Sequence, residues 1–423
     1  MLTLRPQKNI QGTFYLPGDK SISHRALIFS LLARGISTIE NLNTGEDVAT
    51  TASFLMGEGY FQNPPRDAKI AVEGLGFPFI NKTRNFDCRN SGTTLSLLLG
   101  IVREKCVLSG DQSLSSRSFS HQIHVLKECG FQFKFFEKEN SLPFEIRPPV
   151  TIEKFQHFSN TVKSAQLKTT LLLTALNYGQ KILFKESIST RDHTERLLKA
   201  MGAKIEKEGD EIMLESCSEL KPLQLYIPGD VSLASFFITA VLLSENSHVT
   251  LKNMSLNPTR LIFINLLKQM GARINIVSEK LTPEPYGDVE ISSSSISGGE
   301  VPPDMVGGLI DEIPCLALLG LVAEKGIRMR GAERLRNKET DRIAALCYNL
   351  KNMGAHVVEF QDGFEVYPGM KNHSTLRVKS FKDHRMVMAF SLSAFLLKQD
   401  IHIDEPEWVK ISYPNFFKDL FNL

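Results

Sequence analysis

The segment RNKETDR, residues 336–342, combines cations with a carboxylate in one short stretch. Lys338 and Arg342 are four positions apart, which is one turn of an α-helix, and Glu339 lies between them. We expect these residues at the start of a helix. The arrangement would place a proton donor between two groups that bind anions.

A second carboxylate, Asp311, follows an apolar stretch and precedes the apolar segment IPCLALL. Because burial favours the neutral form of a carboxyl group, such a residue is a candidate general base. Asp311 could instead cap the following helix, and the sequence leaves both interpretations open.

Residues 17–25 read PGDKSISHR and precede an apolar helix. Gly18 permits a tight turn, and Ser21 or Ser23 can cap the helix. Lys20 and Arg25 place two cations in its first turns. This pattern predicts an anion site, although a plain capped helix with surface charges is the alternative.

The same turn recurs about half a chain later, 228 minus 17 or 211 residues on, as IPGDVS. Val231 and Phe236 stand there in place of Lys20 and Arg25. The turn is repeated while the cations are not, which favours a binding role for the first copy.

Other polar turns are ambiguous taken one at a time. Gly92 in NSGTT would let a ligand approach backbone N–H groups, and SGDQSLSSR is expected to be a flexible loop ending at Arg117. The cluster TRDHTER, residues 190–196, could be a solvated helix face. We interpret His384 in DHRM as structural, and the histidines show no metal-ligand spacing, so no metal is expected.

These turns belong to a repeat that must position them. A helical stretch, a glycine and an alternating strand recur, as in LLKAMGAKI, LLKQMGARI and NLKNMGAHV. A glycine in left-handed conformation would close each helix. The glycines are about 70 to 80 residues apart, at positions 59, 130, 202, 271 and 354.

The repeat predicts an α/β (α+β) protein of two lobes, built from six βαβαββ-like units, three per lobe. We expect one lobe to comprise residues 1–14 plus 229–423 and to carry both termini, and the other to comprise residues 15–228. The last unit ends in a helix at 416–421, so the N-terminal strand should complete it. Several helix N-termini converging on the cleft between the lobes would favour polyanionic ligands.

Composition restricts the remaining possibilities. The 423 residues carry 49 basic and 47 acidic side chains, a net charge of +2, so no bulk charge attracts nucleic acid or membrane. The six cysteines are dispersed, which is typical of reduced thiols in the cytoplasm. No secretion signal is recognisable, and no apolar run reaches the roughly 18 residues that a membrane span needs.

Seven segments taken in order resemble the EPSP synthase family. They are PGDKSISHRA, NSGTT, KSAQLK, TRDHTE, LIDEIP, NKETDR and DHRMVMAFSL, and they extend from residue 17 to residue 392. The resemblance implies transfer of the enolpyruvyl group of phosphoenolpyruvate to the 5-hydroxyl of shikimate 3-phosphate, through a tetrahedral ketal, with release of phosphate. It also implies a two-lobed enolpyruvyl transferase fold, a cytoplasmic enzyme without a cofactor and, as we expect it, a monomer.

The resemblance assigns roles by position. Asp311 would accept the hydroxyl proton, Glu339 would protonate the methylene carbon, and Lys20 would contact both substrates. Shikimate 3-phosphate would be contacted by Lys20, Ser21, Arg25, Ser164, Ala165, Gln166, Arg191, Asp311 and Lys338. Phosphoenolpyruvate would be contacted by Lys20, Asn90, Gly92, Arg117, Gln166, Arg342, Arg385 and Lys410.

Several positions depart from the family's commonest pattern. An arginine often follows the NSGTT-like turn where this chain has Ser96, and a second serine often precedes the glutamine where it has Ala165, so Arg191 is expected to substitute there. Near the C-terminus a lysine usually adjoins the SYP segment directly. Here Ile411 holds that place and Lys410 comes one residue earlier.

Two alternatives remain. The sister family that transfers enolpyruvyl to a UDP-linked amino sugar typically has a loop cysteine where this chain has SGDQSLSSRSF, and it lacks the DHRM segment. A non-catalytic phosphate-binding or RNA-end-processing relative could be built from similar repeats. The presence of both Asp311 and Glu339 beside basic residues favours an enzyme.

Overall fold

The computed structural model describes residues 1–59, 69–152, 157–160, 164–186, 189–370 and 376–423. They form two compact units, which we call the terminal unit (residues 1–17 and 228–423) and the inner unit (residues 18–227). The lobe boundaries expected from the repeated turns are 14/15 and 228/229, whereas the compact units change over at 17/18 and 227/228.

The inner unit contains three small sheets, with strand orders β13-β3-β4, β5-β6-β8-β7 and β11-β12-β10-β9. The strands are β3 (Arg34–Glu40), β4 (Lys69–Leu75), β5 (Asn85–Asp87), β6 (Cys106–Ser109), β7 (Gln132–Phe135), β8 (Phe144–Arg147), β9 (His157–Asn160), β10 (Ile182–Glu186), β11 (Ile205–Glu208), β12 (Glu211–Leu214) and β13 (Gln224–Tyr226). The helices are α1 (Lys20–Leu32), α2 (Glu46–Gly57), α3 (Gly92–Ile101), α4 (Gln112–Ser116), α5 (Ser120–Glu128), α6 (Ala165–Asn177) and α7 (His193–Ala200).

The terminal unit also contains three sheets, with strand orders β1-β22-β21, β15-β16-β14-β2 and β17-β18-β20-β19. The strands are β1 (Leu2–Leu4), β2 (Gln11–Tyr15), β14 (His248–Ser255), β15 (Arg273–Ile276), β16 (Tyr286–Ser292), β17 (Gly299–Glu300), β18 (Ile327–Met329), β19 (Ala355–Phe360), β20 (Gly363–Met370), β21 (Leu376–Val378) and β22 (Ile401–Ile403). The α-helices are α8 (Val231–Leu243), α9 (Ile262–Gln269), α10 (Pro303–Leu309), α11 (Ile313–Leu319), α12 (Arg342–Asn352), α13 (His384–Ser391) and α14 (Phe416–Phe421), and the 3-10 helices are η1 (Pro258–Arg260), η2 (Glu333–Asn337), η3 (Leu392–Phe395) and η4 (Pro406–Ile411).

Each of the six sheets contains one parallel pair of strands, and in four of them the chain passes between the two strands through helices: α3, α6, α10 with α11, or α13. In the β9–β10 pair, for example, α6 connects the two parallel strands, and β11 and β12 then add an antiparallel hairpin. A parallel pair needs a long crossover, which a buried helix provides. The prediction of six repeated α/β units, three per lobe, is therefore confirmed.

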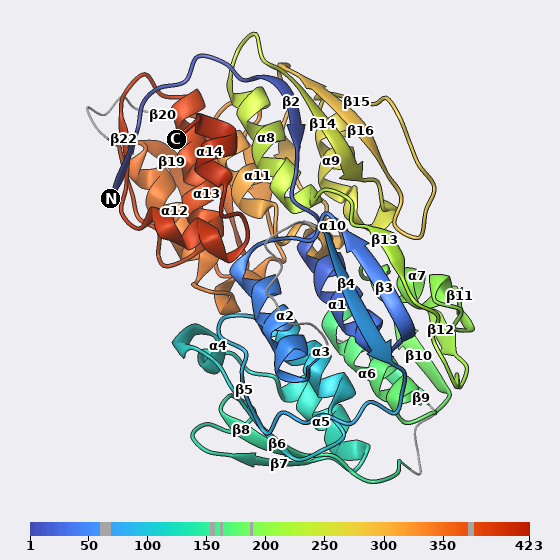
Figure 1. Ribbon diagram of the computed structural model, residues 1–423. Helices are drawn as coiled ribbons and strands as arrows, with labels where there is room; N and C mark the ends of the chain where they lie inside the picture. The colour runs from blue at the N-terminus through green and yellow to red at the C-terminus, as the bar shows by residue number, and fades with distance from the viewer. Residues whose placement is uncertain (60–68, 153–156, 161–163, 187–188, 371–375) are drawn as a thin grey trace. The chain divides into compact units, whose positions relative to one another are not determined.

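The chain passes twice between the two units. Near each passage a sheet is completed by a strand from a distant part of the sequence. β2 pairs in parallel with β14, and β13 pairs in parallel with β3. β1 pairs with β22 in the last sheet, as expected for an N-terminal strand that completes the final unit. The terminal unit thus holds both chain ends (Figure 1).

Three helices in each unit form its core. In the inner unit α1, α3 and α6 lie side by side (Figure 1), and in the terminal unit α8, α11 and α13 pack together. Every residue of α8, α11 and α13 is buried. Burying one Leu or Phe side chain contributes roughly 1.5–3 kcal/mol, so these helices are fixed mainly by packing.

Left-handed glycines end the outer helix of five repeats, as the sequence predicts. Each has a positive φ: +87° at Gly59, +92° at Gly130, +92° at Gly202, +101° at Gly271 and +79° at Gly354. The N–H groups accordingly bond back into the preceding turn, as from Gly202 N to Lys199 O at 3.1 Å.

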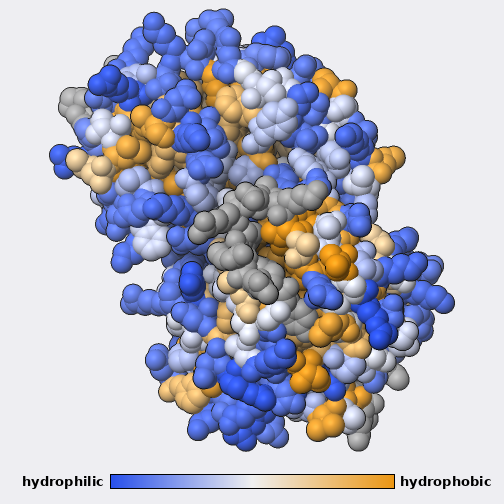
Figure 2. All heavy atoms as spheres, viewed as in Figure 1, coloured by the Kyte–Doolittle hydropathy of each residue, from blue (hydrophilic) through white to orange (hydrophobic). Residues whose placement is uncertain are grey.

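The surface carries charged residues with scattered apolar ones. On the face drawn in Figure 2, hydrophilic residues cover most of the surface and hydrophobic residues form separate patches. Among the described residues, no helix is both long enough and apolar enough to span a bilayer.

We predict that Gly202→Ala destabilises the inner unit by roughly 1–2 kcal/mol, because an L-residue there is forced into left-handed conformation. The cost is conformational only, since a Cβ atom would approach nothing more closely than Lys221 Cδ at 3.8 Å. Gly57→Ala is the control: this helical glycine would place its Cβ 3.5 Å from Thr83 Oγ1, and alanine should be neutral or stabilising by up to about 1 kcal/mol. Chemical denaturation measures both, and equal effects would contradict the conformational explanation.

Candidate functional site

In the three core helices of the inner unit, α1, α3 and α6, accessible residues occur only at the N-terminal end. Only the first two residues of each helix are not buried, and they are Lys20 and Ser21 in α1, Gly92 and Thr93 in α3, and Ala165 and Gln166 in α6. Five of these six are predicted site residues. The helix N-termini therefore present free N–H groups and a partial positive charge at an accessible surface.

Each of these helices has a side-chain cap. Asp19 accepts a hydrogen bond from Ile22 N at 3.0 Å, Ser91 from Thr94 N at 3.2 Å and Ser164 from Leu167 N at 3.2 Å. The prediction that Ser21 or Ser23 caps α1 is therefore wrong. Asp19 stands at the N-cap position, which leaves Ser21 available for other contacts.

Arg25 is buried, and three elements hold its guanidinium. Nε donates to Thr194 Oγ1 at 2.9 Å, Nη2 to Thr169 Oγ1 at 2.9 Å and Nη1 to the carbonyl of Ser21 at 3.0 Å. Arg191 Nη1 donates to Ser21 Oγ at 3.2 Å. Arg25, Ser21 and Arg191 are thus brought together, as the expected shikimate 3-phosphate set requires.

Lys20 forms an ion pair that the sequence did not reveal. Its Nζ lies 2.7 Å from Asp47 Oδ2 in α2, and the two side chains are 20% and 12% exposed. The pair holds the ammonium group at the start of α1.

A second group of predicted residues surrounds Gly92. A Cβ atom built on Gly92 would lie 3.6 Å from Arg117 Nη1, and Gln166 Nε2 donates to Thr93 Oγ1 at 3.2 Å. The Asn90 side chain donates to Asp111 Oδ2 at 2.7 Å. Asp111 caps α4, so the expected flexible loop before Arg117 is in fact a short helix that fixes the arginine.

A buried hydrogen-bond chain joins α1, α2 and α3. His24 Nδ1 lies 2.7 Å from Thr51 Oγ1, which lies 2.7 Å from Thr94 Oγ1, and Thr94 Oγ1 donates to Ser91 Oγ. Burial and then the charges of Lys20 and Arg25 hold the pKa of His24 well below its ordinary value. His24 therefore adds no charge to this basic surface at neutral pH.

In the terminal unit, Arg342 joins several acidic residues. Its Nε lies 2.7 Å from Asp383 Oδ2, Nη2 lies 2.6 Å from Glu339 Oε2 and Nη1 lies 4.0 Å from Asp311 Oδ1. Burial alone would lower the pKa of Arg342, but the charges of Asp383 and Glu339 outweigh it and raise that pKa.

Asp311 is fixed by an arginine from α13. Arg385 Nη1 donates to the Asp311 carbonyl at 2.7 Å, and Nη2 lies 3.5 Å from Asp311 Oδ1. The N-cap position of α11 belongs to Glu312, so the capping interpretation of Asp311 is wrong. The Asp311 carboxylate faces Arg342 and Arg385 instead.

Lys338 and Glu339 lie before α12 and not within it. The helix begins at Arg342 with Asp341 as its N-cap, so the expected helical turn from Lys338 to Arg342 is wrong. The preceding segment is held by Arg336, whose guanidinium bonds Asp341 Oδ2 at 2.7 Å.

Two other expectations concern single side chains. Lys410 is exposed on η4, which packs against α13, and its role stays a prediction. Ser96 is buried and donates to the Gly92 carbonyl at 2.9 Å, so this position serves packing within α3. Lys163, the first residue of KSAQLK, lies outside the described residues.

The chain matches known proteins over its whole length. The profile of the EPSP synthase (3-phosphoshikimate 1-carboxyvinyltransferase) family matches residues 4–420. A 3-phosphoshikimate 1-carboxyvinyltransferase of Petrotoga mobilis is 37% identical and covers 98% of this chain and 97% of its own. One of Carboxydothermus hydrogenoformans is 38% identical and covers 99% and 97%.

This chain belongs to the EPSP synthase family. A solved EPSP synthase of Acinetobacter baumannii is 31% identical, with a TM-score of 0.85 over 98% of this chain and 96% of its own. The enolpyruvyl transferase NikO of Streptomyces tendae shares the fold, with a TM-score of 0.80 over 100% of this chain and 96% of its own, at 15% identity. The predicted enolpyruvyl transferase fold is confirmed, and the chain is a transferase of this family.

Sequence reasoning missed residues that hold this family's motifs in place. Asp383 pairs with Arg342 although the two are 41 positions apart, and Asp47 pairs with Lys20 across 27 positions. Arg260, which is buried, donates to Ser232 Oγ at 2.9 Å beside Asp230 in the second Pro-Gly-Asp turn. Of these residues, only Asp383 could have been noticed in the sequence, because it is the first residue of the DHRM segment.

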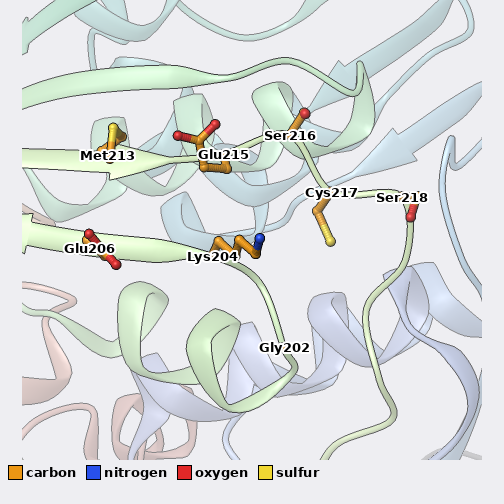
Figure 3. Close-up of a pocket in the computed structure, with 8 residues that line it drawn as sticks. All are labelled: Gly202, Lys204, Glu206, Met213, Glu215, Ser216, Cys217 and Ser218. Carbon is orange, nitrogen blue, oxygen red and sulfur yellow. The ribbon is translucent and has the colours of Figure 1, made fainter.

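A pocket of about 560 Å³ in the inner unit contains none of the predicted site residues (Figure 3). Its lining near β11 and β12 includes Lys204, Glu206 and Glu215, so acidic groups outnumber the one basic group. This pocket does not match a polyanionic substrate. Among the described residues, no group of three or more His, Cys, Asp or Glu side chains could hold a metal ion.

We predict that Asp383→Asn destabilises the terminal unit by about 3 kcal/mol, because it removes a charge that compensates the buried Arg342. The two side chains are 0% and 1% exposed, and asparagine keeps an oxygen to cap α13. As a control, Glu359→Gln alters a half-exposed pair with Arg336 and should cost less than about 1 kcal/mol. Denaturant unfolding measures both, and similar losses would show that burial of the pair does not matter.

Proposed function

We propose that this chain transfers the enolpyruvyl group of phosphoenolpyruvate to the 5-hydroxyl of shikimate 3-phosphate and releases phosphate. The observation that supports this best is the grouping of Asp311, Glu339, Arg342 and Arg385, in which two carboxylates lie beside two arginines. A protein that only binds phosphate would not need both carboxylates there. Membership of the EPSP synthase family supplies the substrates.

For shikimate 3-phosphate, we assign the phosphate to Arg25, Arg191, Ser21 and the start of α6. Arginine forks and helix N-termini both suit a phosphate dianion. Ser164 caps α6, whose first two residues are Ala165 and Gln166, and Arg191 would substitute for the hydroxyl donor that Ala165 lacks. Asp311 and Lys338 would contact the ring and its hydroxyl groups.

For phosphoenolpyruvate, the proposed ligands are arginines and a glycine turn. Arg117 beside Gly92 in the inner unit and Arg342 and Arg385 in the terminal unit would bind its phosphate and carboxylate. Lys20 and Gln166 would contact both substrates, and Asn90 and Lys410 complete the expected set. The reaction thus requires residues of both units.

The chemistry has two balanced steps. The 5-hydroxyl oxygen attacks C2 of phosphoenolpyruvate as Asp311 takes its proton and Glu339 protonates C3, which gives the tetrahedral ketal. The C2–O bond to phosphate then breaks, phosphate leaves with the proton held by Asp311, and the methyl group returns a proton to Glu339. The cations stabilise the charge that develops on the leaving phosphate. A monomeric state and a cytoplasmic location stay predictions.

The direct test is to mix the protein with both substrates and measure phosphate release. We expect release with shikimate 3-phosphate and none when a UDP-linked amino sugar replaces it. No phosphate from shikimate 3-phosphate, under conditions where calorimetry shows that both substrates bind, would overturn the proposal.

We predict that Glu339→Gln lowers kcat roughly 100-fold or more while both substrates still bind, because a positioned acid is lost. Steady-state kinetics and calorimetry measure the two effects. Glu359→Gln is the control. The Glu359 carboxylate lies on β19 and pairs with Arg336, and its substitution should leave kcat unchanged. Normal turnover by Glu339→Gln would remove Glu339 from the mechanism.

Gly92→Ala should weaken binding of phosphoenolpyruvate and of its phosphonate analogues without unfolding the protein. The added Cβ would meet Leu114 Cδ1 at 3.5 Å and Arg117 Nη1 at 3.6 Å, which are ordinary contacts, so only the ligand is crowded. We expect the KM for phosphoenolpyruvate to rise roughly tenfold, a loss of about 1.4 kcal/mol. An unchanged KM would show that no ligand approaches the backbone at Gly92.

A further inference from the structure

The motifs KSAQLK and TRDHTE each end in a charged residue that the proposed mechanism does not use. These residues, Lys168 and Glu195, meet inside the inner unit, where Lys168 Nζ lies 2.7 Å from Glu195 Oε1. The Lys168 side chain is 0% exposed and that of Glu195 is 11% exposed. The charge of Lys168 is therefore used inside the protein, in an ion pair with Glu195.

A second carboxylate completes the cluster. Glu186 at the end of β10 is 0% exposed and lies 3.1 Å from Lys168 Nζ. Burial by itself would raise the pKa of Glu186, but the charge of Lys168 and a hydrogen bond from Thr190 outweigh burial and lower that pKa. Glu186 is thus ionised at neutral pH, and Lys168 is the buried cation that compensates it.

Residues adjacent to the cluster contact Arg25, one of the two arginines assigned to the phosphate of shikimate 3-phosphate. Next to Lys168 in α6, Thr169 accepts from Arg25, and next to Glu195 in α7, Thr194 does the same. The two threonine hydroxyls are also 2.7 Å apart. Lys168 of α6 therefore pairs with Glu195 of α7 through charge. The neighbouring Thr169 and Thr194 contact each other, and both accept hydrogen bonds from Arg25.

The segment before α7 is held from the same cluster. Thr190 Oγ1 donates to Glu186 Oε1, and Arg191 follows directly and donates to Ser21 Oγ at 3.2 Å. If Lys168 lost its charge, the carboxylates of Glu186 and Glu195 would repel each other, and both α7 and the Thr190 turn would shift.

We propose that Lys168, Glu186 and Glu195 are positioning residues for the phosphate of shikimate 3-phosphate, acting through Arg25 and Arg191. The inference rests on the proposed function for the identity of this ligand. It adds that a buried charge cluster, and not only the two arginines themselves, determines affinity for this one substrate. Phosphoenolpyruvate shares Lys20 and Gln166 with this substrate but is not assigned to Arg25 or Arg191, so its binding should depend much less on the cluster.

The test compares Lys168→Met and Glu195→Gln with the matched control Lys207→Met. Lys207 is the other lysine on Glu186, at 3.4 Å, but its side chain is 33% exposed and sits on β11. Glu195→Gln preserves size and a hydrogen-bond acceptor, so it serves if Lys168→Met does not fold. Calorimetry with shikimate 3-phosphate alone, the KM of each substrate, kcat and thermal unfolding are measured for each variant.

We expect both cluster variants to weaken shikimate 3-phosphate binding roughly 10- to 100-fold, as small displacements of positioned groups do. The KM for phosphoenolpyruvate and kcat at saturation should change less than about twofold, and Lys207→Met should match the wild type. Lower thermal stability with an unchanged dissociation constant, or equal rises in both KM values, would overturn the proposal.

The outcomes separate this inference from the proposed function. Wild-type protein that binds shikimate 3-phosphate but releases no phosphate would contradict the reaction and still allow the positioning role to be measured by calorimetry. Wild-type protein that does not bind shikimate 3-phosphate would overturn both.

Discussion

The burial of six core helices, three in each unit, is the constraint on which the rest of this structure depends. Four of the six parallel strand pairs are joined by long helical crossovers, and the core helices are apolar on nearly all sides. Their directions are then fixed relative to their sheets. In the inner unit, contacts between Gln166 and Thr93 and between Arg25 and Thr169 show that the helix N-termini lie next to one another.

The two units share the same arrangement of helices and sheets but place their chemical groups at different positions in it. In the inner unit only the first two residues of each core helix are accessible, so the helix starts and their cations form a basic surface. In the terminal unit the core helices are buried from their first residue. Asp311 lies in the turn before the core helix α11, and Glu339 lies before α12, which is not a core helix. There Arg342, Arg385 and Asp383 hold both carboxylates in place.

Buried charges connect the fold to the chemistry in both units. Arg342 is compensated by Asp383 and Glu339, and Lys168 is compensated by Glu186 and Glu195. Removing one member of such a group leaves an uncompensated charge in a medium of low polarity, which is costly. The groups that bind or transfer are therefore held by partners that are wholly or mostly buried.

The sequence by itself determined the repeat and the fold family, and it suggested most residues of the candidate site. Glycine needs no Cβ and closes helices in left-handed conformation, so its spacing shows where each repeat turns, and short motifs identify the family. What it could not determine were contacts between distant segments. Asp47 with Lys20, Asp383 with Arg342 and Arg260 with Ser232 depend on how helices pack, and no local pattern records that. Local competition also decided the helix starts: Asp19 took the cap expected of Ser21 or Ser23, and Asp341 began α12 after Lys338 and Glu339, because only the folded backbone selects which side chain reaches the free N–H groups.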